Sequence, residues 1–144
     1  THGAEMSGLG AFVATMDFMQ RNKVVEHLWE YGLKLTAMLK RQSEAHGIHD
    51  SFKVGGVACS PYYLTLDSSG VNSLALRTLF SQEMIRNGVL MPWIALSYRH
   101  GDVELAATER AIEKAFAVYR RALNDGVEKY LEGHVIKPVF RKHN

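Results

Sequence analysis

The residues from Leu9 to Met19 form a predicted helix that is apolar on almost every side. Only Thr15 and Asp17 are polar in this stretch, whereas a helix on the surface of a complete domain normally carries a polar face. Helical spacing places one set of side chains on a single stripe: Leu9, Phe12, Val13, Met16 and Met19. Two interpretations remain open, a central helix buried within its own small domain or a helix covered by another subunit or domain.

A second helix is predicted after the short break at Arg21 and Asn22. Asn22 is the candidate cap, because its side chain can accept a hydrogen bond from the free amides of the next turn. The apolar residues that follow recur at intervals of three and four: Val24, Val25, Leu28, Leu35, Met38 and Leu39. Gly47 is expected to end this helix.

From His49 onwards the pattern changes from a helical period to the alternation of strands. Phe52 and Val54 begin it, and a second run ends at Asp67. Pro61 lacks an amide hydrogen and therefore favours an edge or a bulge near that point. A further strand is predicted from Val89 to about Ser97.

The remaining segments are predicted to form helices separated by turns. The cluster 67–70 predicts a turn, and Asn72 or Ser73 is expected to cap a helix that ends at 87–88. A last amphipathic helix begins at 101–102, and an extended tail follows from 134 to 144. The predicted fold is a single α+β domain over residues 1–144, with a short, mainly antiparallel sheet of about three strands covered by four to five helices.

The composition excludes several functional classes. A net charge of +2, with acidic and basic residues interspersed, argues against nucleic acid or an anionic membrane as a partner. Cys59 is the single cysteine and is interpreted as a core residue, so no intrachain disulfide can form and a cytoplasmic location is expected. We find neither an apolar run long enough for a membrane span nor an export signal.

Three groups of residues are candidates for chemistry. Thr1, His2 and Gly3 precede a helix, whose free amides suit a phosphate; the alternative is a disordered terminus with a cap nearby. Arg99 ends a predicted strand and can hold a carboxylate through two parallel hydrogen bonds, unless it is a surface arginine paired with Asp102 or Glu104. The set His46, His49 and Asp50 has too few ligands for a metal site, so no metal is expected.

Four segments in one order carry a resemblance to a known family: 1–6 (THGAEM), 24–29 (VVEHLW), 88–92 (GVLMP) and 97–102 (SYRHGD). Together they resemble the C-terminal part of class III pyridoxal-phosphate aminotransferases, especially the branch like glutamate-1-semialdehyde aminomutase. The resemblance covers essentially the whole chain but only about the last third of such an enzyme. It implies the small C-terminal domain of fold-type I enzymes, a homo-oligomer, and a cofactor phosphate near Thr1, His2 and Gly3.

The resemblance also implies what is missing. The family's cofactor lysine, its pyridinium-binding aspartate and its ring-stacking aromatic residue belong to the large domain, which precedes the matching part. A lysine that binds the cofactor must be desolvated to lower its pKa, and Lys53 and Lys137 are the only candidates here.

The functional expectation is accordingly a truncated class III aminotransferase that uses pyridoxal 5'-phosphate. It would transfer an amino group between an amine or amino acid and a keto acid or aldehyde, with Arg99 on the substrate carboxylate. The alternative is a catalytically inert C-terminal domain that serves structure or oligomerisation.

Overall fold

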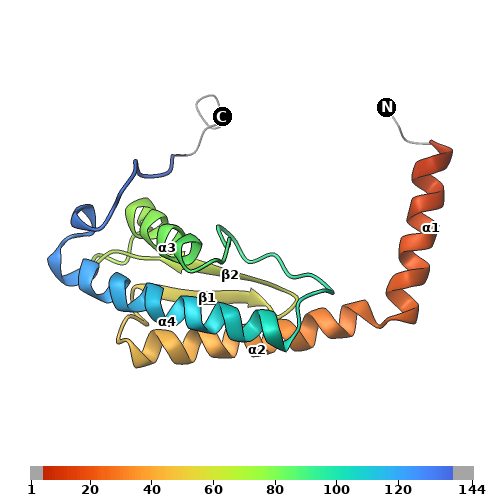
Figure 1. The fold of residues 1–144 in the computed structure, drawn as a ribbon, viewed down its shortest axis with the longest axis horizontal. Helices are drawn as coiled ribbons and strands as arrows, with labels where there is room; N and C mark the ends of the chain where they lie inside the picture. The colour runs from red at the N-terminus through yellow and green to blue at the C-terminus, as the bar shows by residue number, and fades with distance from the viewer. Residues whose placement is uncertain (1–4, 138–144) are drawn as a thin grey trace.

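The structure is a computed structural model that describes residues 5–137. Two helices contact a β-hairpin, a third helix packs against both of them, and another helix projects from one end of this assembly (Figure 1). The elements in chain order are α1 (Met6–Arg21), α2 (Val24–Ala45), β1 (Phe52–Val57), β2 (Ser60–Thr65), α3 (Leu74–Arg86), α4 (Asp102–Asp125) and the 3₁₀ turn η1 (Val127–Lys129). The α+β class predicted from the sequence is confirmed.

The sheet is an antiparallel hairpin of two strands. Its register runs from Phe52 opposite Thr65 to Val57 opposite Ser60. Gly56 adopts a φ of 89° opposite Pro61, a backbone conformation that favours glycine. Cys59 lies half-buried in the tight connection between the strands, so its predicted place in the core is wrong.

An aromatic cluster fills the space between the hairpin, α3 and α4. The ring of Phe52 on β1 lies 4.8 Å from that of Phe116 on α4 and 5.0 Å from that of Phe80 on α3, measured between centroids. Tyr63 and Tyr119 complete the cluster, and these five side chains are buried. Helix α3 packs against this cluster with residues at helical spacing, and all four are buried: Leu76, Leu79, Phe80 and Met84.

The strand predicted from Val89 to Ser97 is not found. This segment bends at Pro92 and Trp93 and forms no ladder, so the described sheet has two strands rather than about three. Side chains take the place of a neighbouring strand: the Tyr63 hydroxyl lies 3.0 Å from the Met91 carbonyl and 2.9 Å from the Pro92 carbonyl. Arg77 also donates to the Pro92 carbonyl at 2.7 Å. Pro92 has no amide hydrogen to offer a ladder.

Most of the predicted helix ends are confirmed. The Ser73 hydroxyl caps α3 by accepting from the Leu76 amide, and Gly88 follows α3 with a φ of 81°. Gly47 follows α2 in the same left-handed region. The predicted cap of α2 is wrong: Asn22 closes α1, with its side-chain amide donating to the Phe18 carbonyl, and Lys23 takes the cap position with a φ of 49°.

Helix α1 has no buried residue. It leaves the start of α2 at a sharp corner and extends away from the rest of the molecule (Figure 1). Phe12 is 62% exposed and Val13 is 65% exposed, so the interpretation of α1 as a helix buried within its own domain is wrong for this chain. Within residues 5–137, α1 and the other helices are too short or too polar to cross a lipid bilayer.

Candidate functional site

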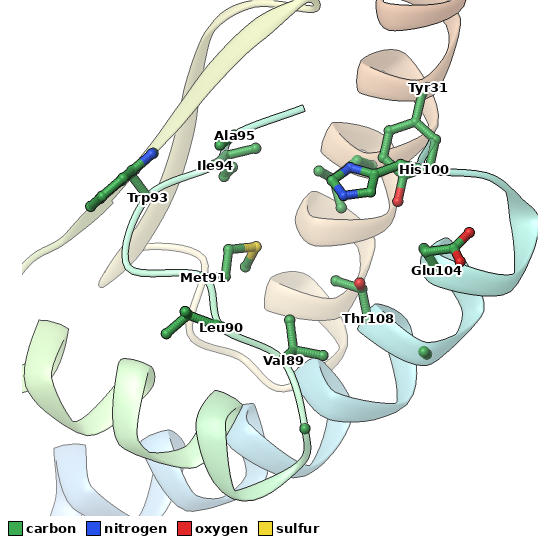
Figure 2. A pocket seen from close by; sticks show the side chains of 13 residues that line it. Tyr31, Val89, Leu90, Met91, Trp93, Ile94, Ala95, His100, Glu104 and Thr108 are labelled. Carbon is green, nitrogen blue, oxygen red and sulfur yellow. The ribbon is translucent and has the colours of Figure 1, made fainter. Parts of the chain in front are cut away.

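A cavity of about 310 Å³ lies between α2, α4 and the segment 88–95. Its volume falls in the range of small-molecule sites. Figure 2 shows that polar side chains of the two helices and apolar side chains of the connecting segment face each other across it. Because polar groups line one side of the cavity and apolar groups line the other, this cavity is the candidate functional site.

The polar side of the cavity is formed by four residues. Tyr31 comes from α2, His100 precedes α4, and Glu104 and Thr108 lie on the first two turns of α4 (Figure 2). Tyr31 is 6% exposed, yet its hydroxyl has no hydrogen-bond partner within residues 5–137. Among the described residues no side-chain polar atom is both fully buried and without a partner, so the Tyr31 hydroxyl is open to the cavity.

The apolar side is formed by the segment that follows α3. Val89, Met91 and Ile94 line the cavity opposite the helices, together with Leu35 of α2. The hydrogen bonds from Tyr63 and Arg77 to the carbonyls of this segment hold it away from α4. The aromatic core therefore fixes the distance between the two sides of the cavity.

His27 connects the start of α2 to the segment before α4. Its Nε2 lies 2.8 Å from the His100 carbonyl oxygen, to which it donates a hydrogen bond. The rings of His27 and Tyr98 meet edge to face at 5.3 Å, and the rings of Tyr31 and His100 lie 5.5 Å apart. These contacts hold the His100 ring at the mouth of the cavity.

The pKa values of Glu104 and Tyr31 are shifted in opposite directions. The Gly101 amide donates to the Glu104 carboxylate at 2.8 Å, which lowers the pKa of Glu104. Burial raises the pKa of Tyr31, and the negative charge of Glu104 raises it further. At neutral pH the cavity therefore presents a carboxylate and a neutral phenol. Within residues 5–137 no basic side chain forms a salt bridge with Glu104.

The structure places the predicted site residues only in part. Thr1, His2 and Gly3 lie outside the described residues. Arg99 is exposed in a turn rather than at the end of a strand. Asp102 pairs with Lys34 at 3.3 Å, and in the described part of the chain neither Asp102 nor Glu104 forms an ion pair with Arg99.

The described lysines do not fit a cofactor-binding amine. Lys53 is exposed and pairs with Asp50 at 3.1 Å, and Lys137 is exposed as well. Every other lysine between residues 5 and 137 is also exposed. A Schiff-base lysine needs a desolvated site, so these residues alone do not complete a site for pyridoxal phosphate.

The three residues weighed as metal ligands have other contacts. The Nδ1 atom of His46 lies 2.9 Å from the Gln42 carbonyl oxygen, and the Nε2 atom of His49 lies 3.5 Å from Asp50. Over residues 5–137 no three histidine, cysteine or acidic side chains come together as a set of metal ligands.

Sequence reasoning did not identify Tyr31, Glu104 or Thr108 as residues of one site. Tyr31 lies one helical turn after His27, and Glu104 occupies the third position of α4, where it accepts from the Gly101 amide. Both positions have an ordinary structural explanation, and only the packing of α2 beside α4 brings them together.

Comparison with known proteins gives a partial similarity to an aminotransferase. The chain is 28% identical over 120 residues to a 3-aminobutyryl-CoA aminotransferase of Cloacimonas acidaminovorans (strain Evry). The aligned residues make up 81% of this chain but only 28% of that protein. No protein-family profile matches the chain, and no solved structure matches it. The chain is therefore distantly related in sequence to an aminotransferase, over about a quarter of that enzyme's length.

Proposed function

We propose that this chain is the small C-terminal domain of a class III aminotransferase that depends on pyridoxal 5'-phosphate. The assembled enzyme would transfer an amino group between an amine or amino acid and a keto acid or aldehyde. The observation that carries this proposal is the 28% identity to an aminotransferase over 120 residues. The α+β arrangement of α2, α3 and α4 on a hairpin agrees with the small domain expected from the sequence.

The chain would contribute substrate contacts, and another part of the enzyme would contribute the cofactor lysine. This division of labour follows from the exposure of every lysine between residues 5 and 137. Thr1, His2 and Gly3 are the proposed contacts to the cofactor phosphate. Arg99 is the proposed partner of the substrate carboxylate, because its guanidinium is exposed and makes no ion pair in the described part of the chain.

A chimera tests this proposal. The residues of the Cloacimonas aminotransferase that align with this chain are replaced by it, and amino transfer from 3-aminobutyryl-CoA is followed with a keto acid as the acceptor. We expect the chimera to retain turnover, whereas the same enzyme with the region deleted should not. A chimera that is folded by circular dichroism and binds the cofactor, but transfers no amino group, would contradict the proposal.

The chimera also tests the role of Arg99. Arg99→Lys should raise the KM for a keto acid about tenfold, because lysine cannot make two parallel hydrogen bonds to a carboxylate. Arg110→Lys is the matched control, since Arg110 is exposed on α4 and has no proposed role. With an aldehyde acceptor, which has no carboxylate, Arg99→Lys should change the KM little. An equal effect on both acceptors would remove Arg99 from the site.

A second candidate function is subunit association through α1, with catalysis absent from this chain. The exposed apolar side chains of α1 support it, because apolar patches on soluble proteins mark interaction surfaces. We propose a second copy of the chain as the partner. An antiparallel pair of α1 helices would bring the exposed apolar side chains of the two copies together and would oppose the two helix dipoles.

Phe12→Glu should therefore abolish self-association of the purified chain, as measured by sedimentation velocity. The introduced carboxylate would be buried without a partner in the proposed helix pair, which is costly. Val103→Glu is the control, since Val103 is 78% exposed on α4, far from α1 in sequence. A monomeric wild-type chain, or equal dissociation by both substitutions, would contradict the pairing.

A further inference from the structure

We infer that the cavity between α2, α4 and residues 88–95 is a binding site for a small primary amine with an apolar body. The inference goes beyond the proposed function, because it involves neither the cofactor nor Arg99. It rests on the arrangement of the cavity's polar and apolar sides (Figure 2).

The first observation is the set of polar groups that have no partner in the protein. The Tyr31 side chain is largely buried, but its hydroxyl is open to the cavity and forms no hydrogen bond within residues 5–137. The Thr108 hydroxyl is half-buried on α4 and has no described partner either. Threonine in a helix commonly donates to the carbonyl four residues earlier, as Thr36 and Thr78 do in this protein. Both hydroxyls are thus free to bind a ligand in the cavity.

The second observation is the charge at the same end of the cavity. The carboxylate of Glu104 uses one oxygen to accept from the Gly101 amide, and no salt bridge neutralises it within the described range. The His100 ring, which has no hydrogen bond there, lies next to it. A carboxylate, two hydroxyls and an imidazole favour a ligand with several N–H donors and a positive charge, and a primary ammonium has three such donors.

The third observation is the apolar surface opposite these groups. Val89, Met91, Ile94 and Leu35 line the rest of the cavity, and they would contact the carbon skeleton of the ligand. Burial of that skeleton adds affinity in proportion to the apolar area removed from water. The site therefore favours a phenylalkyl or alkyl amine over a small hydrophilic cation.

The test uses the complete chain without pyridoxal phosphate and phenethylamine as the probe. Binding is followed by isothermal titration calorimetry and by ¹H–¹⁵N NMR shifts. We expect shifts at residues 89–95 and at Thr108. The affinity for phenethylamine should exceed that for 2-phenylethanol about fivefold, because one charge pair at a partly solvated site contributes about that much. Added salt should reduce this preference.

Three variants test which side chains of the cavity are needed for amine binding. Glu104→Gln keeps an acceptor for the Gly101 amide but removes the charge, so the preference for the amine over the alcohol should disappear. Tyr31→Phe and Thr108→Val remove one hydroxyl each and should weaken amine binding about threefold. Glu113→Gln is the control, because Glu113 is exposed on α4 and does not line the cavity.

A failure of this inference can be distinguished from a failure of the proposed function in the chimera experiment. Equal affinity for amine and alcohol in the wild-type chain, or amine binding unchanged in Glu104→Gln, would overturn the inference. NMR shifts confined to other acidic surface residues would overturn it as well. An inactive chimera would leave these measurements unaffected, since they need no cofactor and no transfer of an amino group.

Discussion

Gly32→Ala is expected to destabilise the chain by about 3 kcal/mol, near the upper end of the usual cost of overpacking. A Cβ atom on Gly32 would lie 1.7 Å from the Ala58 carbonyl oxygen, where α2 meets the connection between the strands. The obstructing atom belongs to the backbone, so it cannot move aside by changing a rotamer. The resulting loss of stability exceeds the gain of about 1 kcal/mol that replacing glycine by alanine brings in a helix interior.

Urea denaturation followed by circular dichroism measures this effect. Gly10→Ala in α1 is the matched control, because nothing lies within 4 Å of the Cβ position there. We expect Gly10→Ala to leave stability unchanged or to raise helix content slightly, since only the propensity term remains. Equal stability of Gly32→Ala and wild type would mean that α2 does not approach the hairpin this closely.

Phe116→Ala is expected to cost about 4 kcal/mol, the range for removing an aromatic ring from a packed core. Phe116 is fully buried, and its ring contacts those of Phe52, Phe80 and Tyr119. The cavity left behind would be bordered by rigid rings, which cannot collapse to fill it. Because α4 carries Phe116 and also forms one side of the candidate cavity, the variant should lose the near-ultraviolet circular dichroism of its aromatic residues together with the proposed binding of phenethylamine.

Phe12→Ala provides the comparison for this effect. It removes the same group, but Phe12 is 62% exposed on α1. Its cost in thermal unfolding should stay below about 0.5 kcal/mol at concentrations where the chain is monomeric. Similar losses for the two phenylalanines would show that α1 packs on the body of the protein in solution.

The sequence was most informative where one face of an element meets the core. In α3 and α4 the apolar positions recur at helical spacing, and the residues at those positions are buried except Leu105 and Leu123 at the two ends of α4, which are partly buried. Ser73 and Gly88 were predictable as helix ends because their roles depend on local geometry alone.

The sequence was less informative where the outcome depends on contacts between distant segments. Residues 89–97 have the apolar character of a strand, but Tyr63 and Arg77 bind their carbonyls and no neighbouring strand pairs with them. In α1, periodicity could not specify what covers the apolar side chains, and within the described structure nothing buries them.

The candidate cavity could not be predicted from sequence spacing. Tyr31 and Thr108 are separated by about half of the chain, and each occupies an ordinary helical position. Only the packing of α2 on α4 places their hydroxyls in one cavity. Arg99, in contrast, was identified by its chemistry alone, and its role remains a prediction.

The corner between α1 and α2 has a mechanical consequence for the cavity. Lys23 holds a left-handed conformation there, Asn22 binds the last turn of α1, and the next turn of α2 carries the His27 bond to the His100 carbonyl. His27 links the first turn of α2 to the segment that precedes Glu104, so we expect a partner that reorients α1 to act on the cavity through α2. By thermodynamic reciprocity, if a partner on α1 alters the amine affinity by some factor, the amine must alter that partner's affinity by the same factor.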